Sequence, residues 1–180
     1  MEARKKKNTL FKKSRTANFD KMEMASKIKS LTDATKQVKS WQKEGQKVVF
    51  TNGCFDLIHL GHVDYLEKAR NLGDKLVIGL NTDGSVSRFK GPERPLQDQN
   101  SRARVLAAMQ FVDLVVFFDE DTPKELISEL VPNVLVKGSD YLAENIVGAD
   151  VVKNNGGVVK TIDFVPGYST TRIVEKIKRT

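Results

Sequence analysis

Short apolar runs alternate with amphipathic segments along most of this 180-residue chain. Five runs with the length and β-branched content of buried strands occupy residues 47–51, 75–80, 112–118, 133–138 and 157–162. Segments with the apolar spacing of helices occupy residues 61–73, 100–111, 122–130, 149–154 and 169–178. The alternation predicts βαβ units, and therefore an α/β fold in which a parallel sheet carries helices on both faces.

The region before the first strand is also expected to be helical. Ser30 and Asp33 form a weak capping box, and Gly45 suits the position just after a helix, so a helix is expected over residues 30–45. A shorter helix is expected over residues 19–29. The polar, glycine-containing residues 81–99 are expected to form a loop after the second strand.

The basic residues are concentrated near the N-terminus. The formal net charge is +7, but residues 1–47 contain 14 Lys and Arg against 5 Asp and Glu, whereas residues 48–180 contain 16 against 18. We therefore predict a basic N-terminal arm over residues 1–29 and one folded domain over residues 30–180. Two interpretations of the arm are open, a solvated tail or a nonspecific contact with RNA or another acidic surface.

The composition favours a soluble, cytoplasmic protein. No stretch approaches the roughly 18–20 consecutive apolar residues of a membrane span, and the N-terminus lacks the apolar segment of a signal peptide. The single cysteine, Cys54, cannot form an internal disulfide.

Unusual residues follow the first strand, in the segment "NGCFDLIHLGH" of residues 52–62. Ligands of parallel α/β sheets bind beyond the carboxyl ends of the strands. Asn52 and Gly53 let the backbone turn and approach a ligand closely. His59 and His62 are three residues apart at the start of a helix, so both imidazoles can point the same way. The free N–H groups of a helix start favour an anion, and the pattern therefore predicts a phosphate site.

Other chemistry is compatible with the same residues. His59 and His62 could bind zinc with Cys54 as a third ligand, although the chain contains no further histidine. Cys54 could be a nucleophile activated by His59, or a buried residue without a chemical role.

Four motifs in order along the chain resemble a known superfamily. The segment "GCFDLIHLGH" is similar to the H-x-G-H signature of the cytidylyltransferase-like nucleotidyltransferases, which have a Rossmann-like sheet. "NTDGSVSRFKGPERP", "VKGSDY" and "GYSTTRI" resemble their later motifs. Taken together, the four motifs are most similar to those of the heptose 1-phosphate adenylyltransferases. In that family the domain is either fused to a sugar kinase or stands alone, and this chain resembles the stand-alone form. The resemblance covers about residues 30–178 and leaves out most of the arm.

The resemblance implies transfer of AMP from ATP to a sugar 1-phosphate, with release of pyrophosphate. D-glycero-D-manno-heptose 1-phosphate is the implied acceptor, and ADP-heptose the product. A phosphate monoester is already largely dianionic at pH 7, so it needs no general base. Positioning and electrostatic stabilisation are then the tasks of the protein, and Mg²⁺ or another divalent cation is expected to accompany ATP.

The resemblance also assigns roles to residues. His59, His62 and Lys90 are the expected catalytic residues. The expected nucleotide-binding residues include both histidines. The others are Asn52, Gly53, Cys54, Phe55, Lys137, Asp140, Ser169, Thr170 and Thr171. Asp140 is also the expected neighbour of the metal. The expected sugar-phosphate residues are Asp56, Asp83, Lys90 and Arg94. Arg102 and Arg104 could either face the site or lie on a helix surface.

Two further functions are compatible with the sequence. The first is a cytidylyltransferase acting on a small polyol phosphate such as glycerol 3-phosphate, because the residues that read the base are not visible in the sequence. The second is a nucleic-acid-binding module that uses the basic arm, although the charge of the folded part argues against it. Small-molecule substrates, no membrane partner and a possible homodimer are the expected interactions.

Overall fold

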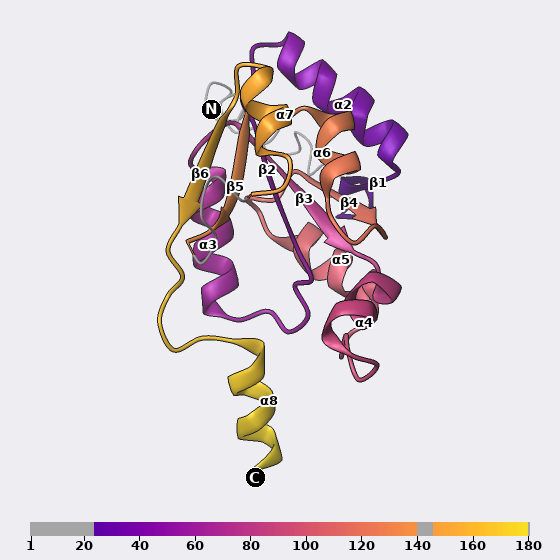
Figure 1. Ribbon diagram of the computed structural model, residues 1–180, viewed down its shortest axis with the longest axis vertical. Coiled ribbons are helices and arrows are strands. Elements are labelled where there is room, and N and C mark those ends of the chain that lie inside the picture. Colours follow the sequence, from indigo (N-terminus) through magenta and orange to yellow (C-terminus); the bar gives the residue numbers. More distant parts are fainter. Residues whose placement is uncertain (1–23, 140–145, 180) are drawn as a thin grey trace, which may run out of the picture.

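The computed structural model describes residues 24–139 and 146–179, and its described part is one parallel sheet with helices on both faces (Figure 1). The sheet order is β1-β4-β3-β2-β5-β6. Its strands are β1 (Ile28–Lys29), β2 (Val48–Gly53), β3 (Lys75–Asn81), β4 (Leu114–Phe118), β5 (Val134–Gly138) and β6 (Val158–Ile162). The helices are α2 (Leu31–Lys43), α3 (Leu60–Arg70), α4 (Asp83–Lys90), α5 (Gln99–Ala108), α6 (Lys124–Leu130), α7 (Ala149–Asn154) and α8 (Thr170–Lys178), after a 3₁₀ turn, η1 (Met24–Lys27). The predicted fold class is confirmed.

Two apolar layers enclose the sheet. Successive residues of a strand point to opposite faces, so Phe50 packs in one layer and Val49 in the other. Helices α2, α6 and α7 cover the first face, and α3 and α5 contribute to the second (Figure 1). Because β2, β3 and β5 lie inside the sheet, their apolar runs are continuous rather than alternating, which made these strands visible in the sequence.

The order in which successive strands are added to the sheet reverses next to β2. From β2 the chain adds β3 and β4 on one side, and then returns to add β5 and β6 on the other. All strand pairings in the described part of the chain are parallel, and Phe50 of β2 is opposite both Val77 and Leu135. The loops after β2 and β5 therefore diverge, and they leave a crevice at the carboxyl edge of the sheet.

Two expectations for the N-terminal half are wrong. The helix expected over residues 19–29 lies partly outside the described residues, and from residue 24 it is replaced by η1 and the edge strand β1. Residues 81–99, expected to be a loop, begin with the last residue of β3 and contain helix α4. Thr82 caps that helix by accepting a hydrogen bond from the Ser85 N–H at 3.2 Å, and Val86 is fully buried.

The boundary between arm and domain stays a prediction, but residues assigned to the arm pack on the sheet. β1 pairs with β4, and the Lys27 ammonium donates to the Met109 carbonyl at 3.2 Å.

The C-terminal end differs from the rest of the described chain in burial. β6 is the last strand at its edge of the sheet, and Val158 is 48% exposed. Helix α8 extends away from the sheet and contains no buried residue (Figure 1). None of the helices in the described ranges has the length and apolar character needed to cross a bilayer.

Candidate active site

A pocket of about 580 Å³ lies at the carboxyl edge of the sheet, beside the crevice between β2 and β5. Its size is typical of a site for a small ligand. Asn52, in β2, and Lys137, in β5, lie on its wall, and the Lys137 ammonium donates to the Asn52 side-chain oxygen. The end of α4, the β4–α6 connection and the segment before α8 complete the wall.

The pocket brings together most of the residues predicted from the sequence. Those that line it are Asn52, Gly53, Cys54, Phe55, Asp56, His62, Lys90, Lys137 and Thr170. His59, Asp83, Arg94, Ser169 and Thr171 lie outside its lining. Asp140 lies outside the described residues, so the metal-binding role proposed for it stays a prediction.

The two histidines are stacked on each other at the start of α3. Their ring centroids are 3.9 Å apart and the ring planes differ by 21°. His59 is the N-cap residue, and its carbonyl accepts from the His62 N–H at 2.9 Å, so the first helical turn fixes the pair. Phe55 supports the other side of His62, with ring centroids 5.4 Å apart.

The surroundings favour the neutral form of both imidazoles. Burial lowers the pKa of His59, and burial followed by the positive charges of His59 and Lys90 lowers the pKa of His62 to about 4. Among the described residues, the Nδ1 atom of each ring is buried without a hydrogen-bond partner. Buried polar atoms are normally paired, so the Nδ1 atom of His62, which lines the pocket, suits a hydrogen bond to a ligand or water.

The shift at His62 predicts how stability depends on pH. The unfolded chain binds a proton at His62 near pH 6.5, whereas the folded chain does so only near pH 4. We expect the stabilising contribution to be complete above pH 6.5 and to be lost as the pH falls toward 4. Urea unfolding at pH 7 and pH 5 measures this loss, which should be smaller in His62→Asn; an equal loss would contradict the assignment.

Gly61 is required between the histidines because of space. A Cβ atom at this position would lie 3.1 Å from the His59 ring and 3.4 Å from the Tyr168 Cβ. A side chain here would therefore need the His59 ring to shift by a few tenths of an ångström.

The Cys54 thiol lies beside Lys90 in the pocket. Burial raises the pKa of the thiol, although Lys90, which also contacts it by a hydrogen bond, and Arg102 oppose the shift. A thiol with a raised pKa is a poor nucleophile at pH 7. The geometry thus favours a packing role for Cys54 over covalent catalysis.

We expect Cys54→Ser to retain kcat and KM within a few fold, because a thiol with a raised pKa contributes little as a nucleophile. Steady-state assays of both proteins test this. Loss of turnover in a variant with an unchanged circular dichroism spectrum would point to a thiol mechanism.

Asp56 joins two loops. One is the segment between β2 and α3, here called the histidine loop, and the other is the loop that follows α4. The Asp56 carboxylate accepts from the N–H groups of Leu96 and Gln97 at 2.9 and 3.0 Å and from the Arg94 guanidinium at 2.8 Å. Burial alone would raise its pKa, but these donors outweigh burial, so the pKa of Asp56 lies below its ordinary value. Asp56 is only 4% exposed, and this geometry gives it a role in holding the two loops together.

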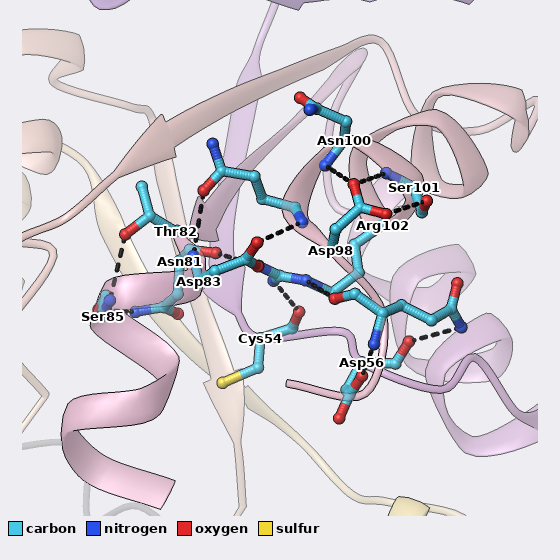
Figure 2. Close-up of polar contacts among 12 residues, drawn as sticks. Cys54, Asp56, Asn81, Thr82, Asp83, Ser85, Asp98, Asn100, Ser101 and Arg102 are labelled. Atoms are coloured by element: carbon cyan, nitrogen blue, oxygen red, sulfur yellow. Dashed lines mark hydrogen bonds and ion pairs between the residues drawn. The ribbon is translucent and has the colours of Figure 1, made fainter. Parts of the chain in front are cut away.

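Asp83 and Arg102 form an ion pair beneath the same loops (Figure 2). Their N–O distance is 2.7 Å, and the Arg102 side chain is fully buried. Arg104, in the same helix, is exposed. The structure thus separates two arginines that the sequence could not distinguish.

The start of α8 adjoins the histidine loop. The Ser169 hydroxyl caps the helix by accepting from the Arg172 N–H at 3.2 Å, and the Thr170 hydroxyl donates to the Leu57 carbonyl at 3.4 Å. Thr171 is exposed. Of the three predicted hydroxyl residues, Thr170 is the one that lines the pocket.

Sequence reasoning missed the apolar part of the pocket wall. The residues concerned are Tyr65, Phe89, Phe118, Pro123, Val147 and Phe164. Phe118 is the last residue of β4, so the rule that ligands bind at strand ends could have identified it. Aromatic and apolar walls suit the flat face of a nucleobase.

The structure also bears on the zinc site that His59, His62 and Cys54 could form. Within residues 24–139 and 146–179, no three His, Cys, Asp or Glu side chains come together in an arrangement that could hold a metal ion. The described residues therefore do not supply the ligand set that a structural zinc site needs.

A Rossmann-like sheet with a histidine pair at its β2–α3 connection fits the nucleotidyltransferase class. The chain belongs to the cytidylyltransferase-like family, whose sequence pattern matches residues 50–176. The enzyme class and the superfamily expected from the motifs are confirmed.

Curated relatives include the bifunctional protein HldE of several bacteria. The chain is 57% identical to HldE of Magnetococcus marinus over 86% of its own length and 60% identical to HldE of Gluconobacter oxydans over 78%. These matches cover 32% and 29% of the relatives, so the chain spans about a third of their length.

Solved structures share the fold. A lipopolysaccharide core biosynthesis protein from Thermoplasma volcanium has a TM-score of 0.54 at 29% identity, and the match covers 67% of this chain and 98% of that one. Pantoate-beta-alanine ligase from Francisella tularensis has a TM-score of 0.55 over 85% of this chain and 78% of its own, and at 15% identity it is similar in fold alone.

Proposed function

We propose that the chain transfers AMP from ATP to a sugar 1-phosphate, namely D-glycero-D-manno-heptose 1-phosphate, and forms ADP-heptose and pyrophosphate. The observation that supports this most is the pair of stacked imidazoles at the start of α3, of which His62 lines the pocket together with Lys90 and Lys137. Such a wall offers hydrogen-bond donors and positive charge to phosphates. The motif resemblance and the match to the HldE proteins favour the heptose acceptor.

The proposed chemistry is an in-line displacement at the α-phosphorus. An oxygen of the sugar phosphate forms the new P–O bond, and the bond to pyrophosphate breaks, so negative charge grows on the leaving group. His59 and His62 each donate an N–H to this charge, and approach of the phosphates raises the pKa of both rings. Lys90 lies between α-phosphate and acceptor, Arg94 binds the acceptor phosphate, and Thr170 with the N–H groups of the α8 start faces the β- and γ-phosphates.

Asn52, Gly53, Cys54, Phe55 and Lys137 complete the proposed nucleotide site from the ends of β2 and β5. Ser169 and Thr171 belong to it through the start of α8. Asp83 belongs to the acceptor side of the site, where its carboxylate is paired with Arg102. Mg²⁺ would enter as part of the ATP complex, held mainly by phosphate oxygens and water, since the described residues offer no carboxylate cluster. It would neutralise part of the triphosphate charge.

Pyrophosphate release across a panel of substrates tests the proposal. ATP, CTP, GTP and UTP are each combined with heptose 1-phosphate, glucose 1-phosphate and glycerol 3-phosphate. We expect release with ATP and heptose 1-phosphate. Release with CTP and glycerol 3-phosphate alone would identify a polyol phosphate cytidylyltransferase instead. RNA binding that weakens steeply with salt, without any release, would favour a nucleic-acid-binding module.

Deletion of residues 1–16 is expected to change kcat/KM by less than about twofold. These residues match none of the four motifs and contribute mainly solvated basic charge. The truncated and full chains are compared at the same enzyme concentration. A tenfold lower kcat/KM in the truncated chain would show that the arm contributes to the site.

The expected homodimer and cytoplasmic location are part of the proposal. Exposed apolar side chains on β6, on the segment after it and on α8 favour association of two copies, notably Val158, Phe164, Tyr168 and Ile177. Light scattering after size-exclusion chromatography measures the mass, and a monomer at all concentrations would contradict the dimer. The cytoplasm is the compartment that supplies ATP and sugar phosphates.

A further inference from the structure

Arg102 is a fully buried cation that the proposed chemistry does not use. Its guanidinium donates to the Gln97 carbonyl at 3.0 Å, the Cys54 carbonyl at 2.6 Å and the Asn81 carbonyl at 2.8 Å. It also donates to the Asp83 carboxylate at 2.7 Å (Figure 2). A planar guanidinium can satisfy all four acceptors at once, which the single ammonium group of a lysine cannot do.

The four acceptors belong to three separate parts of the site. Cys54 lies in the histidine loop after β2, Asn81 and Asp83 flank the start of α4, and Gln97 lies in the loop that carries Arg94. Asp83 is itself fixed by Gln99, whose N–H donates to its carboxylate at 3.1 Å. Arg102 therefore determines how these three segments are placed relative to one another.

The bond to Cys54 also sets the direction of a backbone donor. In a trans peptide the C=O and the following N–H point in opposite directions. The Cys54 carbonyl points to Arg102, which is not part of the pocket wall, so the Phe55 N–H points away from Arg102. Cys54 and Phe55 both line the pocket, and Phe55 has a φ of 44°, which is unfavourable for a bulky residue and needs such support.

We propose that Arg102 is a positioning residue for nucleotidyl transfer. It holds the histidine loop and the Arg94 loop at the separation at which the two phosphates meet, without contact with either substrate. This inference rests on the proposed function, because it assumes that these loops carry the two phosphates. It assigns a role in catalysis to a residue that lies behind the pocket wall.

The test compares Arg102→Lys and Arg102→Gln with Arg104→Lys and Arg104→Gln. Arg104 lies two residues away in α5 but is exposed, so its variants control for lost charge and for helix propensity. We expect Arg102→Lys to lower kcat about 10–100-fold at saturating substrates, because displacement of a reactant by about 1 Å can cost about 10²-fold. Both Arg104 variants should remain within twofold of the wild type.

A second measurement is independent of turnover. Hydrogen exchange at the Leu96 and Gln97 N–H groups, which Asp56 holds, should be faster in Arg102→Lys than in the wild type, with exchange in α2 unchanged. Faster exchange together with lower kcat of the folded protein supports positioning. Wild-type kcat in folded Arg102→Lys would overturn the inference, and so would failure of both Arg102 variants to fold, which would assign Arg102 to stability alone. Absence of pyrophosphate release by the wild type would instead refute the proposed function.

Discussion

His62→Ala is expected to lower kcat by about 10²–10³, or about 2.7–4 kcal/mol of transition-state stabilisation, which is the typical cost of removing one donor to a developing negative charge. The ring lies on the first turn of α3, stacked on His59 and supported by Phe55, so its position is fixed before ligand binds. The loss should appear in kcat measured at saturating ATP and sugar phosphate. The fold should be retained, because His62 is half-buried at a pocket wall rather than in either apolar layer.

Two companion variants distinguish the interpretations of the histidines. His62→Asn should recover part of the loss, because an amide can still donate a hydrogen bond. His59→Ala should lose a comparable amount with a larger increase in the KM for ATP. If both alanine variants transferred AMP at the wild-type rate, the assignment of this site to nucleotidyl transfer would be wrong. Inactivation by a chelator at saturating Mg²⁺, with loss of bound zinc from the variants, would indicate a zinc site.

Asp56→Ala is expected to lower the free energy of unfolding by about 2–4 kcal/mol, because it leaves the half-buried Arg94 guanidinium and two backbone N–H groups without their acceptor. For a domain of this size the melting temperature should fall by about 10 °C. Activity of the remaining folded protein should also fall, since the loop of Arg94 loses its attachment. Urea unfolding and a substrate titration of the same preparation measure both effects.

Asp150→Asn is the matched control for Asp56→Ala. Asp150 pairs with Lys124 at 3.6 Å, and both side chains are at least 60% exposed, so its loss should cost less than about 1 kcal/mol. Asp56→Asn should lie between the two, because the amide oxygen can still accept one N–H. Equal stability of Asp56→Ala and Asp150→Asn would contradict the role given to Asp56.

The strands of the sheet could be predicted because interior parallel strands are apolar on both faces. Residues 75–80 and 133–138 were assigned to strands now seen as β3 and β5. The edge strand β1 was missed because a strand of two residues is too short to show an alternation of apolar and polar positions. Helix α4 was missed because Gly84 and Ser85 have low helix propensity. Its stability depends on the Thr82 cap and on contacts such as that of Asn81 with Ser85, at 3.0 Å.

The candidate site was predictable where its residues are adjacent in the sequence. The histidine pair could be inferred from spacing alone, and the strand-end rule brought Asn52 and Lys137 to one edge. The attachment of Asp56 to Leu96 could not be inferred, because it joins residues 40 positions apart. For the same reason Arg102 and Arg104 were equivalent in the sequence, since burial is decided by the packing of α5 against the sheet.

The exposure of helix α8 bears on how tightly a ligand can bind at its first turn. The helix begins at the pocket, where Thr170 lines the wall, and none of its residues is buried. A phosphate bound at its first turn, as proposed above, would add contacts to a helix that is otherwise partly or fully exposed along its length. Part of the binding free energy would then stabilise the helix, and the measured affinity would be weaker than the contacts alone would give. Under the proposed function, the same exposure would favour dissociation of the product, a step that limits the rate of many enzymes.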